Sequence, residues 1–211
     1  MNIYFLLLSI MGFLLYKGII CSLVYAPKKI KIISFVALIL MTTRYIALII
    51  LLIRNNQNYL YLLKPVIYTN FLCIPIFGIA SVFIFSRNNK IKLKKILFMC
   101  DILCIAYYIV IYKSSANISI SDFYGYTIKL SLQDYCNVAL LIINSIFITK
   151  GIELLGKTYS NKLGTALIII SSSITLVAVV LTLIDTSFAW LLLGDIAWVV
   201  TIDYGLMRFK R

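Results

Sequence analysis

The chain has 211 residues, of which 63% are hydrophobic and 13% charged, and its mean hydropathy is +1.03. A soluble domain of this length needs more polar surface around one core, so the composition excludes an ordinary globular protein and indicates contact with lipid. The formal net charge of +13 does not indicate nucleic acid as a partner, because the Lys and Arg residues stand in short blocks between long apolar runs.

The apolar runs predict an all-α polytopic membrane protein, a single transmembrane domain with a bundle of about seven helices. A span needs about 20 mostly apolar residues. The candidates in chain order are 3–25, 32–53, 65–85, 96–112, 130–148, 163–184 and 188–207. The first run is too long for the apolar part of a cleavable signal peptide, so we interpret it as a retained helix. The fifth candidate is the weakest because polar residues interrupt it, and only residues 185–187 separate the last two, which predicts a tight helical hairpin.

The distribution of positive charge predicts that the N-terminus lies outside and the C-terminus in the cytoplasm. Cytoplasmic loops carry an excess of Lys and Arg. With this orientation, 14 of the 20 basic residues fall in cytoplasmic segments. They are Lys28, Lys29, Lys31, Arg87, Lys90, Lys92, Lys94, Lys95, Lys150, Lys157, Lys162, Arg208, Lys210 and Arg211. Only Arg54, Lys64, Lys113 and Lys129 fall in outside segments.

Charged residues inside predicted spans are candidates for a ligand or ion site, because burying them in a bilayer is costly. Lys17 and Arg44 fall near the middle of the first and second spans, and Asp195 falls at a similar depth in the seventh. The simplest arrangement pairs Asp195 with one of the two cations. Two interpretations stay open, a structural ion pair or a site for a ligand or ion. Lys17 could also extend its side chain towards the cytoplasmic interface.

Two further aspartates lie towards the cytoplasmic side. Asp101 falls about 8 Å into the fourth span at the rise of an α-helix, and Asp203 lies near the end of the seventh, within reach of Arg208. Cys100 and Cys104 share a helix face close to Asp101, but two thiols and one carboxylate are too few for a metal site. We therefore predict no bound metal and interpret these cysteines as packing residues.

Two segments are expected to depart from straight helices. Pro75 lies near the centre of the third span, where it removes a backbone hydrogen bond and predicts a kink. Residues 113–129 form the longest irregular segment, on the outside in the predicted topology. Its alternating residues predict either a β-hairpin or an interfacial segment above the bundle, with a turn at residues 122–125.

The residue types present exclude several kinds of chemistry. The chain has no histidine, which excludes Ser-His and Cys-His nucleophiles, His-ligated zinc or haem and HExxH peptidase sites. Its nine glycines are scattered and build neither a P-loop nor a dinucleotide fingerprint. We find no catalytic residues, expect no cofactor and lean against an enzyme.

The favoured hypothesis is a non-enzymatic sensing or binding module, or an accessory subunit of a membrane complex. Its partners would be the lipid bilayer and another membrane or cytoplasmic protein chain. The alternatives are a small solute or ion-coupled transporter and a lipid-modifying enzyme that uses Asp101 and Asp203. The many Ile, Lys, Asn and Tyr residues are what AT-rich codons encode, so we expect the plasma membrane of an AT-rich bacterium.

Overall fold

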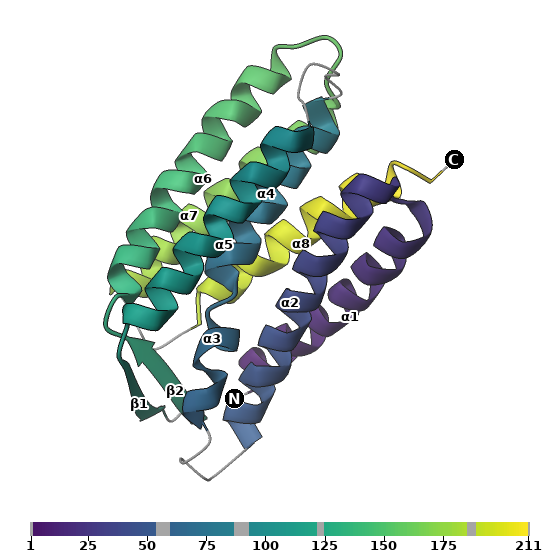
Figure 1. Ribbon diagram of the computed structural model, residues 1–211. Coiled ribbons are helices and arrows are strands. Elements are labelled where there is room, and N and C mark those ends of the chain that lie inside the picture. The colour runs from purple at the N-terminus through teal and green to yellow at the C-terminus, as the bar shows by residue number, and fades with distance from the viewer. Residues whose placement is uncertain (1, 54–59, 87–92, 122–124, 185–188, 211) are drawn as a thin grey trace.

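The computed structural model describes residues 2–53, 60–86, 93–121, 125–184 and 189–210. These residues form a helical bundle with one β-hairpin at one end (Figure 1). The elements in chain order are α1 (Asn2–Tyr25), α2 (Lys28–Ile53), the 3-10 helix η1 (Leu60–Leu63), α3 (Lys64–Ile67), α4 (Asn70–Ser86), α5 (Leu93–Lys113), β1 (Ala116–Ser121), β2 (Gly125–Leu130), α6 (Gln133–Leu155), α7 (Lys162–Ile184) and α8 (Leu191–Met207).

The described part of the chain holds six candidate membrane spans, judged by length and apolar composition. Five of them lie within α1, α2, α5, α6 and α7, and the sixth is the segment Leu60–Ser86 that includes α3 and α4. Helix α8 has only 17 residues. It nevertheless lies in the middle of the bundle, where it packs against α1, α4 and α7. The N-terminus lies at the end of the bundle that carries the hairpin and the C-terminus at the opposite end (Figure 1).

The hairpin and the short helices beside it close one end of the bundle. Strands β1 and β2 pair antiparallel, with Ala116 opposite Leu130 and Ser121 opposite Gly125. Ile128 and Leu130 of β2 are buried against η1, α3 and the end of α2. The Tyr68 hydroxyl donates a hydrogen bond of 2.5 Å to the Ile128 carbonyl. We call η1, α3 and the hairpin the cap, and the end of the bundle that holds them the capped end.

Some boundaries differ from the predicted ones for local reasons. The helix predicted from 130 begins at Gln133, because Leu130 still pairs in β2. It continues beyond 148 to Leu155, where Glu153 accepts hydrogen bonds from Lys150 at 2.8 Å and from Lys157 at 2.5 Å. The hydrogen bond that Lys157 donates to Glu153 raises the pKa of the Lys157 ammonium. The predicted connection at 185–187, the start of the last span at Phe188 and most of the predicted turn at 122–125 lie outside the described residues.

Close packing inside the bundle depends on glycines that face aromatic rings. A Cβ at Gly164 of α7 would lie 2.3 Å from the Phe85 ring of α4, and a Cβ at Gly78 of α4 would lie 2.2 Å from Phe147 of α6. Small residues at such positions let two helices approach closely, which is how helices associate where lipid supplies no hydrophobic drive. Helix α4 is therefore held firmly among α6, α7 and α8.

Helix α5 is the exception to this packing. It contacts mainly α4, and Ile96 is its one buried residue among those described. Most of its other side chains are exposed, including Phe98 and Tyr108. A helix that is apolar on an exposed face needs lipid or another protein to cover it.

Candidate functional site

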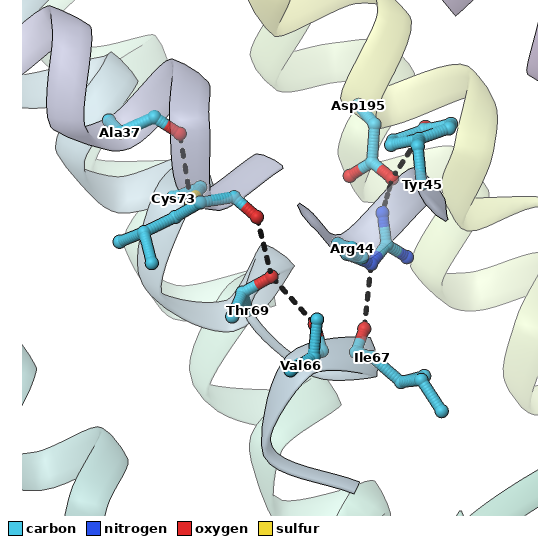
Figure 2. A network of polar contacts seen from close by, with 9 residues as sticks. Ala37, Arg44, Tyr45, Val66, Ile67, Thr69, Cys73 and Asp195 are labelled. Carbon is cyan, nitrogen blue, oxygen red and sulfur yellow. Dashed lines mark hydrogen bonds and ion pairs between the residues drawn. The ribbon is translucent and has the colours of Figure 1, made fainter. Parts of the chain in front are cut away.

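A buried ion pair joins α2 to α8. The Arg44 guanidinium donates through Nη1 to Oδ2 of Asp195, and the two side chains form a salt bridge (Figure 2). Both residues are buried, with Arg44 5% and Asp195 0% exposed. The hydroxyl of Tyr45, the next residue on α2, donates to the same carboxylate oxygen at 3.1 Å. Of the two cations that the sequence placed at a similar depth, Arg44 is therefore the one that pairs with Asp195.

Arg44 also contacts the end of α3, where the third predicted span is interrupted. Its Nε donates a hydrogen bond of 2.7 Å to the carbonyl of Ile67, the last residue of α3 (Figure 2). The helix is interrupted at Tyr68 and Thr69 before α4 begins. An interruption leaves backbone carbonyls without their helical partners, and unpaired carbonyls are costly in a buried setting. Arg44 therefore stabilises the break as well as the carboxylate.

Two further hydrogen bonds hold the break in place. The Thr69 hydroxyl donates to the Val66 carbonyl at 2.9 Å, and the Cys73 thiol donates to the Ala37 carbonyl of α2 at 3.5 Å (Figure 2). Pro75, where the sequence predicts a kink, is buried inside α4, six positions beyond Thr69. The interruption that the structure contains is therefore upstream of the proline.

The electrostatic consequence of this site follows from its burial. Removing two charges from water is costly, and their attraction repays the cost only when further hydrogen bonds satisfy them. Arg44 has two such acceptors, and Asp195 Oδ2 has two donors. Oδ1 of Asp195 is buried and has no hydrogen-bond partner among the described residues. One acceptor of the site thus remains available.

Lys17 and Asp101, the other predicted site residues, lie away from this pair. Lys17 of α1 is exposed and borders a groove whose walls include Tyr16, Cys21 and Lys210. Asp101 of α5 is exposed as well. No group of three or more Cys, Asp or Glu residues that could hold a metal occurs in the part of the chain that the structure describes.

Asp203 is a buried acid that the sequence suggested as a partner of Arg208 and, with Asp101, as a carboxylate of a lipid-modifying enzyme. Its side chain is 3% exposed, and neither carboxylate oxygen has a hydrogen-bond partner within the described ranges. It packs against α1 at Gly18, where a Cβ would lie 2.4 Å from Oδ1. Arg208 instead donates to the Tyr204 hydroxyl. The eight-residue spacing from Asp195 was the available signal, because it places Asp203 near the same side of α8 as Asp195, the side that is buried in the bundle.

A second polar contact region links α8 to α6 and α7. The Trp198 indole nitrogen donates to Asn144 of α6 at 3.3 Å. The hydroxyls of Ser171 on α7 and Thr201 on α8 are 2.5 Å apart. Asn144 and Ser171 belong to polar positions within predicted spans, and both are buried. Buried hydroxyl and amide groups of this kind join helices, at about 0.6 kcal/mol each on average in membrane bundles.

Compared with known proteins, the chain matches no protein-family model and no curated protein sequence. The site must therefore be interpreted from its own chemistry. A guanidinium that is always protonated, a carboxylate with one oxygen free and a tyrosine hydroxyl can bind polar groups or hold helices in register. They contain no nucleophile activated by a base.

Proposed function

We propose that this chain is a seven-span plasma-membrane protein that acts as a non-enzymatic sensing or binding module. The observation that carries the proposal is the position of Arg44, which joins the cap to the core of the bundle. One guanidinium binds the Ile67 carbonyl in the cap and the Asp195 carboxylate on α8. A ligand that displaces the cap would thereby change the contacts of α8, whose other end leads to the C-terminus.

The transmembrane topology is supported by the placement of the chain ends. An odd number of spans puts the two termini on opposite sides, and they lie at opposite ends of the bundle (Figure 1). Helix α8 would be the seventh span, because it runs through the bundle centre although it has only 17 residues. Lys28, Lys94 and Lys210 are among the basic residues described at the end of the bundle opposite the cap. These residues would face the cytoplasm, and the cap would lie outside.

Reporter fusions test this topology. An alkaline phosphatase fused after Ser115, at the capped end, should be active, because this enzyme folds only outside the cytoplasm. The same reporter fused after Ser160 or after Lys210 should be inactive, and a fluorescent protein at those two positions should fluoresce. Phosphatase activity at Lys210 would contradict the seven-span orientation.

Hydrogen exchange tests the coupling between cap and core. In the wild-type protein the paired amides of β1 and β2 should exchange slowly. The Asp195→Asn variant loses the ionic partner of Arg44, so exchange in the hairpin should accelerate at least several-fold. The matched control is Asp101→Asn, which removes an exposed carboxylate from a helix that makes few contacts. Equal exchange in the wild type and in Asp195→Asn would contradict the coupling.

A second candidate function, an ion-coupled transporter, is favoured by the free carboxylate oxygens of α8. Asp195 lies in the half of the helix nearer the cap and Asp203 in the other half. Three of their four oxygens lack a hydrogen-bond partner among the described residues. Buried acids of this kind mark proton relays and ion paths in many membrane proteins.

A flux assay separates the two functions. Purified protein in liposomes with an internal pH-sensitive dye would be exposed to an outward sodium or proton gradient. A binding module should give the same proton flux as empty liposomes. Flux in the wild type that is lost in Asp195→Asn and retained in Asp101→Asn would overturn the binding-module proposal and establish the transporter.

A further inference from the structure

Two exposed charges of the bundle lie far from the ends of their helices. Lys17 stands eight residues before Tyr25, the last residue of α1, and Asp101 stands eight residues after Leu93, the first residue of α5. At the rise of an α-helix each is about 12 Å from the helix end. Both ends lie on the side of the bundle opposite the cap. Among the described residues, no other exposed charge is more than two turns from both ends of its helix.

An exposed aspartate at this depth needs a partner. Charged residues within membrane spans almost always face the bundle interior or pair with another charge. A lysine can extend its long apolar stem to the interface, but aspartate has a single methylene and cannot. Asp101 is exposed on a helix whose only buried described residue is Ile96. No hydrogen bond or salt bridge to Asp101 occurs within the described residues.

The charge that fits Asp101 is present on the same chain but on another helix. Copies of one protein insert into a membrane with the same orientation, and both residues lie about 12 Å from a helix end on the same side of the bundle. Lys17 of one copy and Asp101 of the next would therefore lie at similar depth. Helices α1 and α5 do not pack together within a copy, since α1 packs mainly against α2 and α8 and α5 mainly against α4. A contact between them must therefore be made between copies.

The surroundings of both charges suit such a contact. Phe13 and Tyr16 beside Lys17 are 78% and 68% exposed, and Phe98 and Ile105 beside Asp101 are 65% and 61% exposed. These apolar neighbours would exclude water and lipid headgroups from the ion pair. Apolar surface alone gives little drive between helices in lipid, so the ion pair would determine which faces meet.

We propose that copies of this chain associate through α1 of one and α5 of the next, with Lys17 paired to Asp101 across the contact. The two surfaces differ, so the contact is heterologous and forms a closed ring or an open chain. This inference depends on the proposed membrane placement and orientation and is independent of what the protein binds. Reporter fusions that give the seven-span orientation in a protein that stays monomeric would overturn this inference alone.

Charge reversal tests the proposal because the contact is heterologous. Copies with donor or acceptor fluorescent proteins at the C-terminus would be placed in vesicles of phosphatidylethanolamine and phosphatidylglycerol. Wild-type copies should show energy transfer above that of a monomeric membrane protein at the same density. The Lys17→Asp variant carries two acidic faces and the Asp101→Lys variant two basic faces. Each alone should lose the transfer, and a mixture of the two should regain it.

Three matched variants complete the experiment. Lys94→Glu reverses an exposed charge on α5 near its end and should keep wild-type transfer. Asp203→Asn should also keep it. This variant removes the electrostatic interaction of Lys17 with Asp203 in its own copy, so it distinguishes that interaction from the contact between copies. Lys17→Gln and Asp101→Asn should each reduce the transfer, and they serve if a reversed charge prevents folding. Wild-type transfer at the monomer level, or a mixture that does not regain transfer, would overturn the proposal.

Discussion

Helices α5 and α8 are both apolar and both contain aspartate, yet the bundle uses them in opposite ways. Ten of the 17 residues of α8 are buried, and its Asp195 is fully enclosed with Arg44. In α5 only Ile96 is buried among the described residues, and Asp101 is exposed. Hydropathy alone does not separate the two helices. Asp195 is therefore paired within its own chain, whereas Asp101 has no hydrogen bond or salt bridge among the described residues.

The largest expected effect comes from breaking the ion pair of α8. Arg44→Met or Asp195→Asn alone leaves a buried charge unpaired and should lower the free energy of unfolding by about 3–5 kcal/mol. The double variant Arg44→Met, Asp195→Leu should cost less than the sum of the single changes. Unfolding by sodium dodecyl sulfate, followed by the fluorescence of the two tryptophans, measures these energies.

The matching change on α5 sharpens the comparison. Asp101→Asn in detergent-dispersed monomers should change the free energy of unfolding by no more than about 0.5 kcal/mol, as exposed substitutions usually do. A loss comparable to that of Asp195→Asn would mean that the two aspartates have similar surroundings. Additive losses from Arg44 and Asp195 would likewise show that these two side chains do not touch.

An intermediate effect is expected from filling the space between packed helices. Gly164→Ala places a methyl group against the buried ring of Phe85 and should cost about 1–3 kcal/mol. The control is Gly12→Ala on α1, because nothing lies within 4 Å of a Cβ there. Thermal denaturation of both variants in the same detergent would test this. Equal melting temperatures would contradict the close contact of α4 with α7.

A smaller loss than that of Gly164→Ala is expected from breaking the hydroxyl contact between α7 and α8. Ser171→Ala removes the partner of Thr201 and should cost about 0.6 kcal/mol, the average for such bonds in a membrane bundle. Ser145→Ala on α6 is the control, since that exposed hydroxyl donates to the Leu141 carbonyl of its own helix. A cost above about 2 kcal/mol would indicate a larger polar network around Ser171.

The sequence allowed the long helices to be predicted because apolar length is a local property. It also placed Arg44 and Asp195 at similar depth, and the structure brings them together. Depth could not decide between Arg44 and Lys17, because the face that each helix turns to its neighbours depends on packing across the whole bundle. Lys17 is exposed for this reason, although it lies as deep in its helix as a partner would need.

The interruption of the third predicted span gives a second reason why the sequence alone could not predict the whole structure. The sequence predicts a kink at Pro75, and α4 continues through this residue. The helix is interrupted upstream of it, at Tyr68 and Thr69, where no pattern in the sequence predicts a break. The acceptors and donors that stabilise this break are Arg44, Ala37 and Val66, of which two are distant in sequence. A local pattern cannot contain them. The burial of Asp203 escaped prediction similarly, because it depends on Gly18 of another helix.

The guanidinium of Arg44 has an electrical consequence for the bundle. Arginine keeps its proton at every physiological pH, so Asp195 alone sets the net charge of the pair. While Asp195 is ionised, the pair is neutral, and moving it along the membrane normal requires no work against the transmembrane voltage. Protonation of Asp195 would leave one elementary charge, and moving one such charge across the whole membrane changes its energy by about 2.3 kcal/mol per 100 mV. In the proposed membrane placement, the protonation of Asp195 would therefore determine whether this part of the protein responds to membrane potential.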